Sequence, residues 1–314
     1  MRSLITIAIV LLAGGINAQQ LALSSQYLFN EILVNPGATG GKDYIPVQVN
    51  FRKQWAAFPG SPTTQNASCH GSINQSLGFG GNLFNDASGP SRRTGMNVNG
   101  SYHINLQRDK KRYIGFGLGV SLSQHAIDVN KLTTYLPDDP AVIRGYNNKL
   151  VPDANLGVFY RHKETAFIGI SAYNLVQSNR DLFEFENTLY NPLARTYYLF
   201  GGYDFEMSNK TMLKTSLLVQ AIETGTVQFD VNAIVVMKNL FWVGLAYRNL
   251  DAVALLAGTQ IGQFKFGYSY DYTISDIGKY SHGSHEVFLE LQLYKTNGGG
   301  GNWFKRIQRY APKI

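Results

Sequence analysis

One pattern of alternating side chains recurs throughout residues 211–294. Along residues 227–237 the odd-numbered residues are all apolar, whereas Gln228, Asp230 and Asn232 are polar. Successive side chains of a strand point to opposite faces, so an alternation of period two is typical of β-strand. The pattern returns in four later segments, residues 241–247, 253–261, 264–272 and 287–293. This stretch therefore predicts consecutive strands of one kind.

Neighbouring segments are joined by connections that are too short for a helix. Lys238-Asn239 and Gly262-Gln263 are two examples, and such connections predict antiparallel hairpins. Strands of soluble sandwiches usually have about 5–6 residues, whereas these segments approach the roughly 9–11 residues of a tilted strand that crosses a bilayer. Tyr268, Tyr270 and Tyr272 gather near a segment end, as in the aromatic girdles of membrane barrels. We expect an all-β protein, a transmembrane antiparallel β-barrel of the outer membrane.

The lengths of the connections support the same interpretation along the whole chain. Counting the alternating segments from residue 46 to residue 294 gives about fourteen strands, an even number. The long loops are expected after the first, third, fifth, seventh and thirteenth strands, at residues 55–62, 84–92, 128–151, 175–193 and 273–283. Connections after even strands are shorter. This asymmetry predicts short periplasmic turns, long extracellular loops and both termini in the periplasm.

The N-terminus has the features of a secretory signal peptide over residues 1–18. Arg2 precedes an apolar run, and small residues lead to an expected cleavage site after Ala18. The apolar run is shorter than the roughly 20 residues of a membrane-spanning helix. Residues 19–45 follow and include turn-rich sequence, so they either form a flexible lead or fold into the lumen or against its periplasmic rim.

The C-terminus departs from a simple barrel ending. Residues 295–314 hold four consecutive glycines, Gly298 to Gly301, and then a basic, aromatic tail. This tail is either a disordered end or a peptide that docks on a periplasmic partner. The candidate partner-binding residues are Trp303, Phe304, Lys305, Arg306 and Arg309.

Cysteine usage and charge exclude several classes of protein. Cys69 is the only cysteine, which excludes an intrachain disulfide and a multi-cysteine metal site. The formal net charge is +7, yet no long basic run occurs before the tail, so nucleic acid is not an expected partner.

No motif predicts catalysis, a cofactor or a bound metal. His282, His285 and Glu286 form the one local cluster, but at a loop-to-strand junction their spacing does not place ligands on one face. Asp138, Asp139 and Asp251 are interpreted as solvated turn residues. Gly115, Gly117 and Gly119 alternate along one face of a predicted strand. Their spacing is not that of a phosphate-binding loop, and they are interpreted as residues that let a strand bend.

Several motifs together carry a resemblance to a known family. The N-terminal block includes Ser25, Gln26, Tyr27, Phe29, Asn30, Asn35, Pro36 and Gly37; later blocks include Arg52, Trp55, Asn85, Asp86, Gly89 and Pro90, and then residues 267–272 and 283–286. In this order the chain resembles the PorP/SprF family of outer-membrane proteins of the Bacteroidota type IX secretion system. The motifs do not reveal which residues contact cargo, and Asn35-Pro36-Gly37 and Asn85-Asp86 are interpreted as turn residues.

The resemblance implies a non-enzymatic barrel that assists the export or surface attachment of large cargo, including gliding adhesins and their C-terminal domains. It also implies contact with outer-membrane lipid, periplasmic ring components and peptidoglycan-associated components. Two other classes stay open: a passive channel or hydrophobic-solute transporter, and a secreted soluble β-rich binding protein. The predicted lumen-facing residues, Arg248, Lys265, Asp271, Glu286 and Glu290, suit either a wet pore or a plugged interior.

Overall fold

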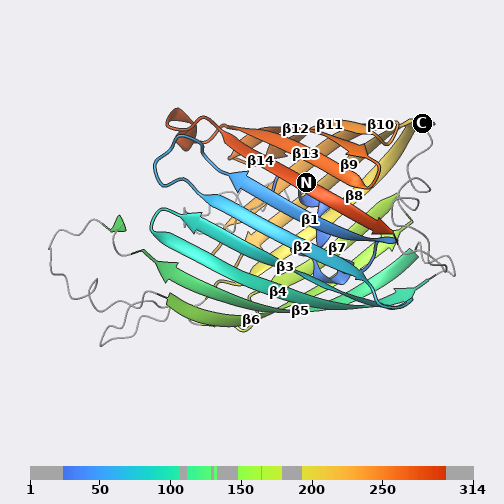
Figure 1. Ribbon diagram of the computed structural model, residues 1–314, viewed down its shortest axis with the longest axis horizontal. Coiled ribbons are helices and arrows are strands. Elements are labelled where there is room, and N and C mark those ends of the chain that lie inside the picture. Colours follow the sequence, from blue (N-terminus) through green and yellow to red (C-terminus); the bar gives the residue numbers. More distant parts are fainter. Residues whose placement is uncertain are drawn as a thin grey trace, which may run out of the picture.

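Fourteen antiparallel strands close into one barrel in the computed structural model (Figure 1). It describes residues 24–106, 112–128, 131–132, 148–163, 165–178 and 193–294. The strands are β1 (Tyr44–Lys53), β2 (Thr63–Ser72), β3 (Leu77–Ser88), β4 (Ser91–Asn105), β5 (Arg112–Ile127), β6 (Asn148–His162), β7 (Ala166–Tyr173), β8 (Thr196–Ser208), β9 (Thr211–Ile222), β10 (Val227–Met237), β11 (Phe241–Arg248), β12 (Ala252–Ile261), β13 (Phe264–Thr273) and β14 (Ser284–Tyr294). The expected fold class is confirmed.

The first and last strands pair with each other and close the sheet. β1 and β14 run antiparallel in register from Tyr44 opposite Tyr294 to Lys53 opposite His285. Every other strand pairs with its neighbours in chain order, so the barrel has no open edge. Closure satisfies the backbone N–H and C=O groups that hydrocarbon cannot solvate.

The two faces of the strands differ as the alternation predicts. Val49 and Leu255 on the outer face are 48% and 53% exposed, whereas Asn232 and Ser269 on the inner face are fully buried. An apolar belt without a covering layer suits lipid and is the opposite of a soluble sandwich. Within the described part of the chain, no helix is long and apolar enough to cross a membrane.

The connections divide the barrel into a short-turn end and a long-loop end. All connections after even strands are short, and the start of β1 and the end of β14 lie at this short-turn end. The prediction of a long loop at residues 84–92 is wrong. Strand β3 continues to Ser88, and only Gly89-Pro90 separates it from β4. Polar cross-strand bonds extend this hairpin, for example from Arg92 Nε to Asn85 Oδ1 at 2.7 Å. β6 likewise begins at Asn148, earlier than expected.

The interior of the barrel is not lined by polar side chains alone. Two buried apolar clusters occupy it, where the alternation predicted a polar lumen. The first contains Tyr27, Val34, Ala38, Tyr113, Phe159, Phe167, Tyr198, Phe200 and Leu218; the second contains Phe29, Ile234, Trp242, Ala246, Ala254, Leu256 and Phe288. Both clusters include residues that precede β1. The reason for the difference is therefore that part of the chain packs inside the barrel.

Residues 24–43, which we call the plug, lie inside the lumen as a compact segment (Figure 1). They form three single turns of 3₁₀-helix, η1 (Tyr27–Phe29), η2 (Glu31–Leu33) and η3 (Pro36–Ala38). Between Ser25 and Gly40 every residue is buried except Leu28 and Leu33, which are half-buried. The segment that was expected to be either a lead or a luminal element is thus a luminal element over the residues described.

Glycines of the barrel wall make room for the plug. A Cβ atom on Gly115 would lie 2.2 Å from the carbonyl oxygen of Gly37, and one on Gly117 would lie 2.2 Å from the carbonyl carbon of Pro36. Gly157 and Gly169 leave room for the side chain of Asn35, since a Cβ atom on either would lie within 2.5 Å of its amide group. The glycine alternation on β5 therefore serves close approach of two backbones, a role that a bending strand alone does not require.

This contact predicts that Gly117→Val unseats the plug. The added side chain overlaps backbone that cannot move without breaking the turn at Pro36, so we expect a loss of about 1–3 kcal/mol. The unfolding temperature of the detergent-solubilised barrel, read from heat-modifiable gel migration, should fall. Gly100→Val is the matched control, because nothing lies within 4 Å of the corresponding Cβ position. Equal melting of both variants and the wild type would contradict the packing described.

Candidate functional site: the plug and the two ends of the lumen

A buried network of charges holds the first described residues of the plug in the long-loop half of the lumen. We call it the latch; it consists of Ser25, Arg52, Asp230, Arg248, Asp271 and Glu286. Arg52 donates to Glu286 Oε2 at 2.9 Å and to Asp271 Oδ2 at 2.7 Å. Arg248 donates to Asp230 Oδ2 at 3.2 Å. Strands β1, β10, β11, β13 and β14 supply these side chains because each presents an inward position near its long-loop end.

Ser25 lies at the centre of the latch. Its hydroxyl donates to Asp271 Oδ2 at 2.7 Å and accepts from Arg52 and from Arg248, each at 3.1 Å. Its backbone N–H donates to Glu286 Oε2 at 2.9 Å, and the Ser24 hydroxyl donates to the other oxygen of Glu286. One small plug residue thus satisfies groups from several strands that are otherwise far apart in sequence.

The latch contains three carboxylates and two guanidinium groups, all 4% exposed or less. Removing one partner of such a buried pair is costly, about 3–5 kcal/mol, because the other charge stays desolvated. The latch therefore favours one position of the plug.

The middle of the plug is bonded to the backbone of the barrel. Asn35 Nδ2 donates to the carbonyl oxygens of Val158 and Ile170, both at 3.0 Å, while its Oδ1 accepts from the N–H of Gly37 at 2.8 Å. Asn35 therefore caps the turn η3, as turn chemistry predicts, and also fixes that turn to the strands β6 and β7. Burial raises the pKa of the Tyr27 hydroxyl, which stays protonated within hydrogen-bond distance of Ser216 Oγ, at 3.1 Å.

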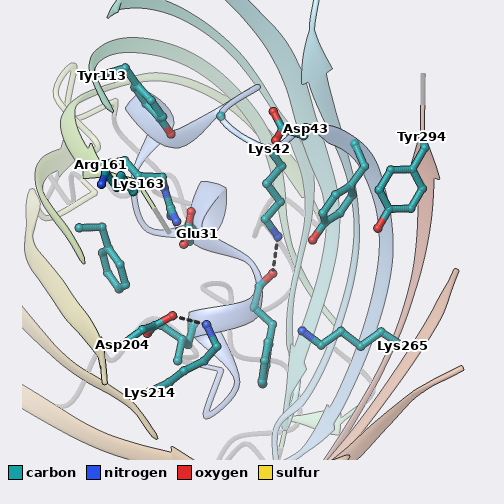
Figure 2. Close-up of a pocket in the computed structure, with 15 residues that line it drawn as sticks. Glu31, Lys42, Asp43, Tyr113, Arg161, Lys163, Asp204, Lys214, Lys265 and Tyr294 are labelled. Atoms are coloured by element: carbon teal, nitrogen blue, oxygen red, sulfur yellow. Dashed lines mark hydrogen bonds and ion pairs between the residues drawn. The ribbon is translucent and has the colours of Figure 1, made fainter. Parts of the chain in front are cut away.

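The other end of the plug borders a cavity of about 420 Å³ at the short-turn end, which we call the mouth cavity (Figure 2). Its lining residues come from the plug and from strands around the barrel: Leu28, Phe29, Glu31, Gly41, Lys42, Asp43, Tyr44, Tyr113, Arg161, Lys163, Phe167, Asp204, Lys214, Lys265 and Tyr294. Figure 2 shows the ammonium groups of Lys42 and Lys265 directed into the opening.

Ion pairs connect the plug to the wall of the mouth cavity. Arg161 Nη2 lies 2.5 Å from Glu31 Oε1, and Lys214 pairs with Asp204. Lys42 donates to the carbonyl oxygen of Phe29 at 3.2 Å. Burial acts to lower the pKa of Lys42, but its electrostatic interactions with Tyr44 and Glu290 outweigh burial and raise the pKa. Lys42 is therefore a cation at physiological pH.

The motif residues of the N-terminal block converge, whereas the later blocks are spread over the long-loop end. Gln26, Tyr27, Phe29, Asn30, Asn35, Pro36 and Gly37 are all buried plug residues, and Arg52 belongs to the latch. Trp55 has a positive φ of 49° in the loop after β1, and its backbone N–H donates to Ser284 Oγ.

Asn85 and Asp86 lie on strand β3, so their interpretation as turn residues is wrong, and Gly89 with Pro90 forms the turn. Among the described residues, no group of three or more His, Cys, Asp and Glu side chains is placed to hold a metal ion, and His282 and His285 make separate hydrogen bonds. His285 Nδ1 is bonded to the Tyr268 hydroxyl at 2.7 Å, and the backbone carbonyl of His282 accepts from Tyr270. Several predictions fall outside the described residues: the expected signal peptide at residues 1–18, Asp138, Asp139, and the tail with Trp303, Phe304, Lys305, Arg306 and Arg309.

Sequence reasoning placed Arg248, Asp271 and Glu286 on the lumen face but did not bring them together. Asp230 was recognised only as one polar residue of an alternation. A usable signal existed: all four charged residues occupy inward positions close to the long-loop ends of their strands. Charges that are enclosed in this way are expected to pair.

The fold and the filled lumen define the class of this protein, an outer-membrane β-barrel with an internal plug. Residues 16–291 match the family described as type IX secretion system membrane protein PorP/SprF. The chain belongs to this family, as the motifs indicated.

Solved structures with the same architecture have low sequence identity to the chain. The CymD monoaromatic hydrocarbon channel has a TM-score of 0.51 and 13% identity, with 90% of this chain and 96% of the other covered. The toluene transporter TodX of P. putida has a TM-score of 0.49 and 9% identity, with 85% and 95% covered. At these identities the likeness concerns the fold alone. No curated protein matches the chain.

The latch predicts that Arg52→Met releases the plug. The substitution leaves Asp271 and Glu286 with one guanidinium fewer, at a cost of about 3–5 kcal/mol. In a Cys69→Ser background, a Leu33→Cys probe on the plug should react faster with a maleimide when Arg52 is replaced. Arg195→Met is the control, because its pair with Glu223 is solvent-exposed and contributes about 0–1 kcal/mol. Equal labelling rates of the Leu33→Cys probe without a further change, with Arg52→Met and with Arg195→Met would show that the latch does not hold the plug.

Proposed function

We propose that this protein is a non-enzymatic accessory barrel of type IX secretion, which acts through protein–protein contacts. It assists the export or surface attachment of large cargo, such as gliding adhesins, through the C-terminal domains of that cargo. Family membership over residues 16–291 is the observation that carries the proposal. The plug supports it, because a filled lumen suits a docking platform better than a conduit.

The orientation we propose follows the asymmetry of the connections. The short turns face the periplasm, where the ring and the peptidoglycan-associated components lie, and the long loops face the exterior, where cargo is displayed. The barrel then begins and ends at the periplasmic side, with Tyr44 paired to Tyr294. Ser24 lies within the lumen against Glu286, and the residues before it are outside the described part of the chain.

A hydrocarbon channel is the second candidate function, since CymD shares the architecture. Such a channel needs a continuous path for its solute. Here the two apolar clusters, which include Tyr27 and Phe29 from the plug, and the latch in the long-loop half fill the lumen. This packing favours the secretion function over the channel.

A deletion strain distinguishes the two functions. We expect loss of surface display of a co-encoded adhesin or other secreted cargo, measured by whole-cell immunolabelling, with restoration by the wild-type gene. We expect this loss because cargo that is held through contacts with the barrel has no attachment site when the barrel is missing. Normal display together with altered uptake of aromatic hydrocarbons would instead favour the channel.

We also propose that the C-terminal tail docks on a periplasmic component. Trp303 and Phe304 would supply apolar anchors, and Lys305, Arg306 and Arg309 would supply charge. Truncation after Tyr294 should reduce co-purification of periplasmic partners, measured by detergent pull-down and mass spectrometry, while the barrel still shows heat-modifiable migration. A change of Trp303 and Phe304 to serine tests the anchors alone. Unchanged co-purification in both variants would rule out the docking role.

A further inference from the structure

The lining of the mouth cavity contains more cationic side chains than its ion pairs with carboxylates use. Its described lining includes five cationic residues, Lys42, Arg161, Lys163, Lys214 and Lys265, and three carboxylates, Glu31, Asp43 and Asp204. Glu290 stands behind the lining, 3.9 Å from Lys42. Cations therefore outnumber carboxylates even when Glu290 is included.

Three ion pairs use three of the five cations and leave Lys163 and Lys265. Arg161 pairs with Glu31, Lys214 with Asp204, and Lys42 with Glu290. Asp43 and Lys163 are exposed at the rim. Among the described residues, Lys265 makes no ion pair with a carboxylate, although its side chain is half-buried.

Aromatic rings hold the Lys265 ammonium group in place. Its Nζ lies 3.9 Å from the ring centroid of Phe29 and 5.0 Å from that of Trp242. Contacts of this kind orient a cation but do not neutralise it. Glu290 lies opposite Lys265 on β14 and attracts it, as does Glu31, but Glu290 also pairs with Lys42 and Glu31 with Arg161. An ammonium group that points into a cavity and shares its carboxylates with other cations is suited to receive an anion from outside.

The shape of the cavity restricts what this anion can belong to. Residues of the plug and of strands around the barrel line it, and Tyr44 and Tyr294 place it at the short-turn end, where β1 starts and β14 ends (Figure 2). Phe29, Tyr44, Phe167 and Tyr294 add apolar and hydroxyl-bearing surface beside the cations. A volume of about 420 Å³ is within the range of small-ligand sites, about 300–1,000 Å³.

We propose that the mouth cavity binds an acidic peptide segment of a periplasmic protein, with a carboxylate seated on Lys265 and flanked by Lys42 and Lys163. The inference deepens the proposed function and rests on it for the compartment that the short-turn end faces. A peptide fits better than a phospholipid headgroup, whose acyl chains belong outside the barrel wall. The chain's own tail is excluded by charge, since residues 302–314 are basic.

Binding to the purified full-length protein in non-ionic detergent tests the site directly. A rhodamine-labelled oligoglutamate peptide should raise fluorescence anisotropy on binding, and added salt should weaken the complex. An oligoglutamine peptide with the same label should bind at least about tenfold more weakly, because it cannot make charge-assisted hydrogen bonds.

Substitutions of Lys265 test whether its ammonium group binds the peptide carboxylate. Lys265→Met keeps the apolar stem against Phe29 and Trp242 but removes the charge, so we expect about a tenfold weaker complex, and Lys265→Arg should restore binding. Lys210→Gln is the matched control, because Lys210 is an exposed cation in the β8–β9 turn at the same end but does not line the cavity. Heat-modifiable migration confirms that each variant is folded.

The outcomes are distinct. Equal binding of both peptides, or an equal loss with Lys210→Gln, would overturn the site in favour of general attraction to basic residues. Unchanged oligoglutamate binding by Lys265→Met would restrict Lys265 to supporting the plug and would also overturn it. Preferential, Lys265-dependent binding of phosphatidylglycerol vesicles would assign the cavity to lipid. None of these results depends on cargo display, so the deletion strain tests the proposed function separately.

Discussion

Hydrocarbon offers no hydrogen-bond partner to a peptide group, so a sheet that crosses a bilayer must close on itself. Here closure depends on the pairing of β1 with β14, which joins residues more than two hundred positions apart. The same two strands carry Arg52 and Glu286, whose ion pair also holds Ser25. The seam of the barrel and the anchorage of its plug are therefore one structural unit.

The alternation predicted the barrel, its strand number and most of its connections because each depends on local sequence. A strand that faces lipid is apolar at every second residue, as along Val227–Met237, and this pattern recurs along β11, β12, β13 and β14. The hairpin at Gly89-Pro90 was predicted less well. The ends of its strands are polar, so residues such as Asn85 and Arg92 show no alternation of apolar and polar side chains, although they pair across strands.

The interior could not be predicted in the same way because its contacts join distant parts of the chain. Gly117 lies against Pro36, and Asn35 bonds the carbonyl oxygens of Val158 and Ile170. The Asn35 contact leaves no periodic trace in the sequence, and the alternating glycines of β5 mark a face of small residues without showing what lies against it. The motif residues Gln26 to Gly37 carried the resemblance to the family without indicating their role, and only the fold shows that their common property is burial inside the barrel.

The depth at which Ser24 lies has a consequence for biogenesis. Ser24 bonds Glu286 in the long-loop half, and the segment runs from there to the short-turn end at Asp43, where β1 begins. On the way, Tyr27 joins the cluster of Phe159, and Phe29 packs against Phe288; both of these wall rings are fully buried. A barrel that closed without the plug would leave such rings facing water in its lumen, so we expect the plug to take its place as the seam between β1 and β14 forms.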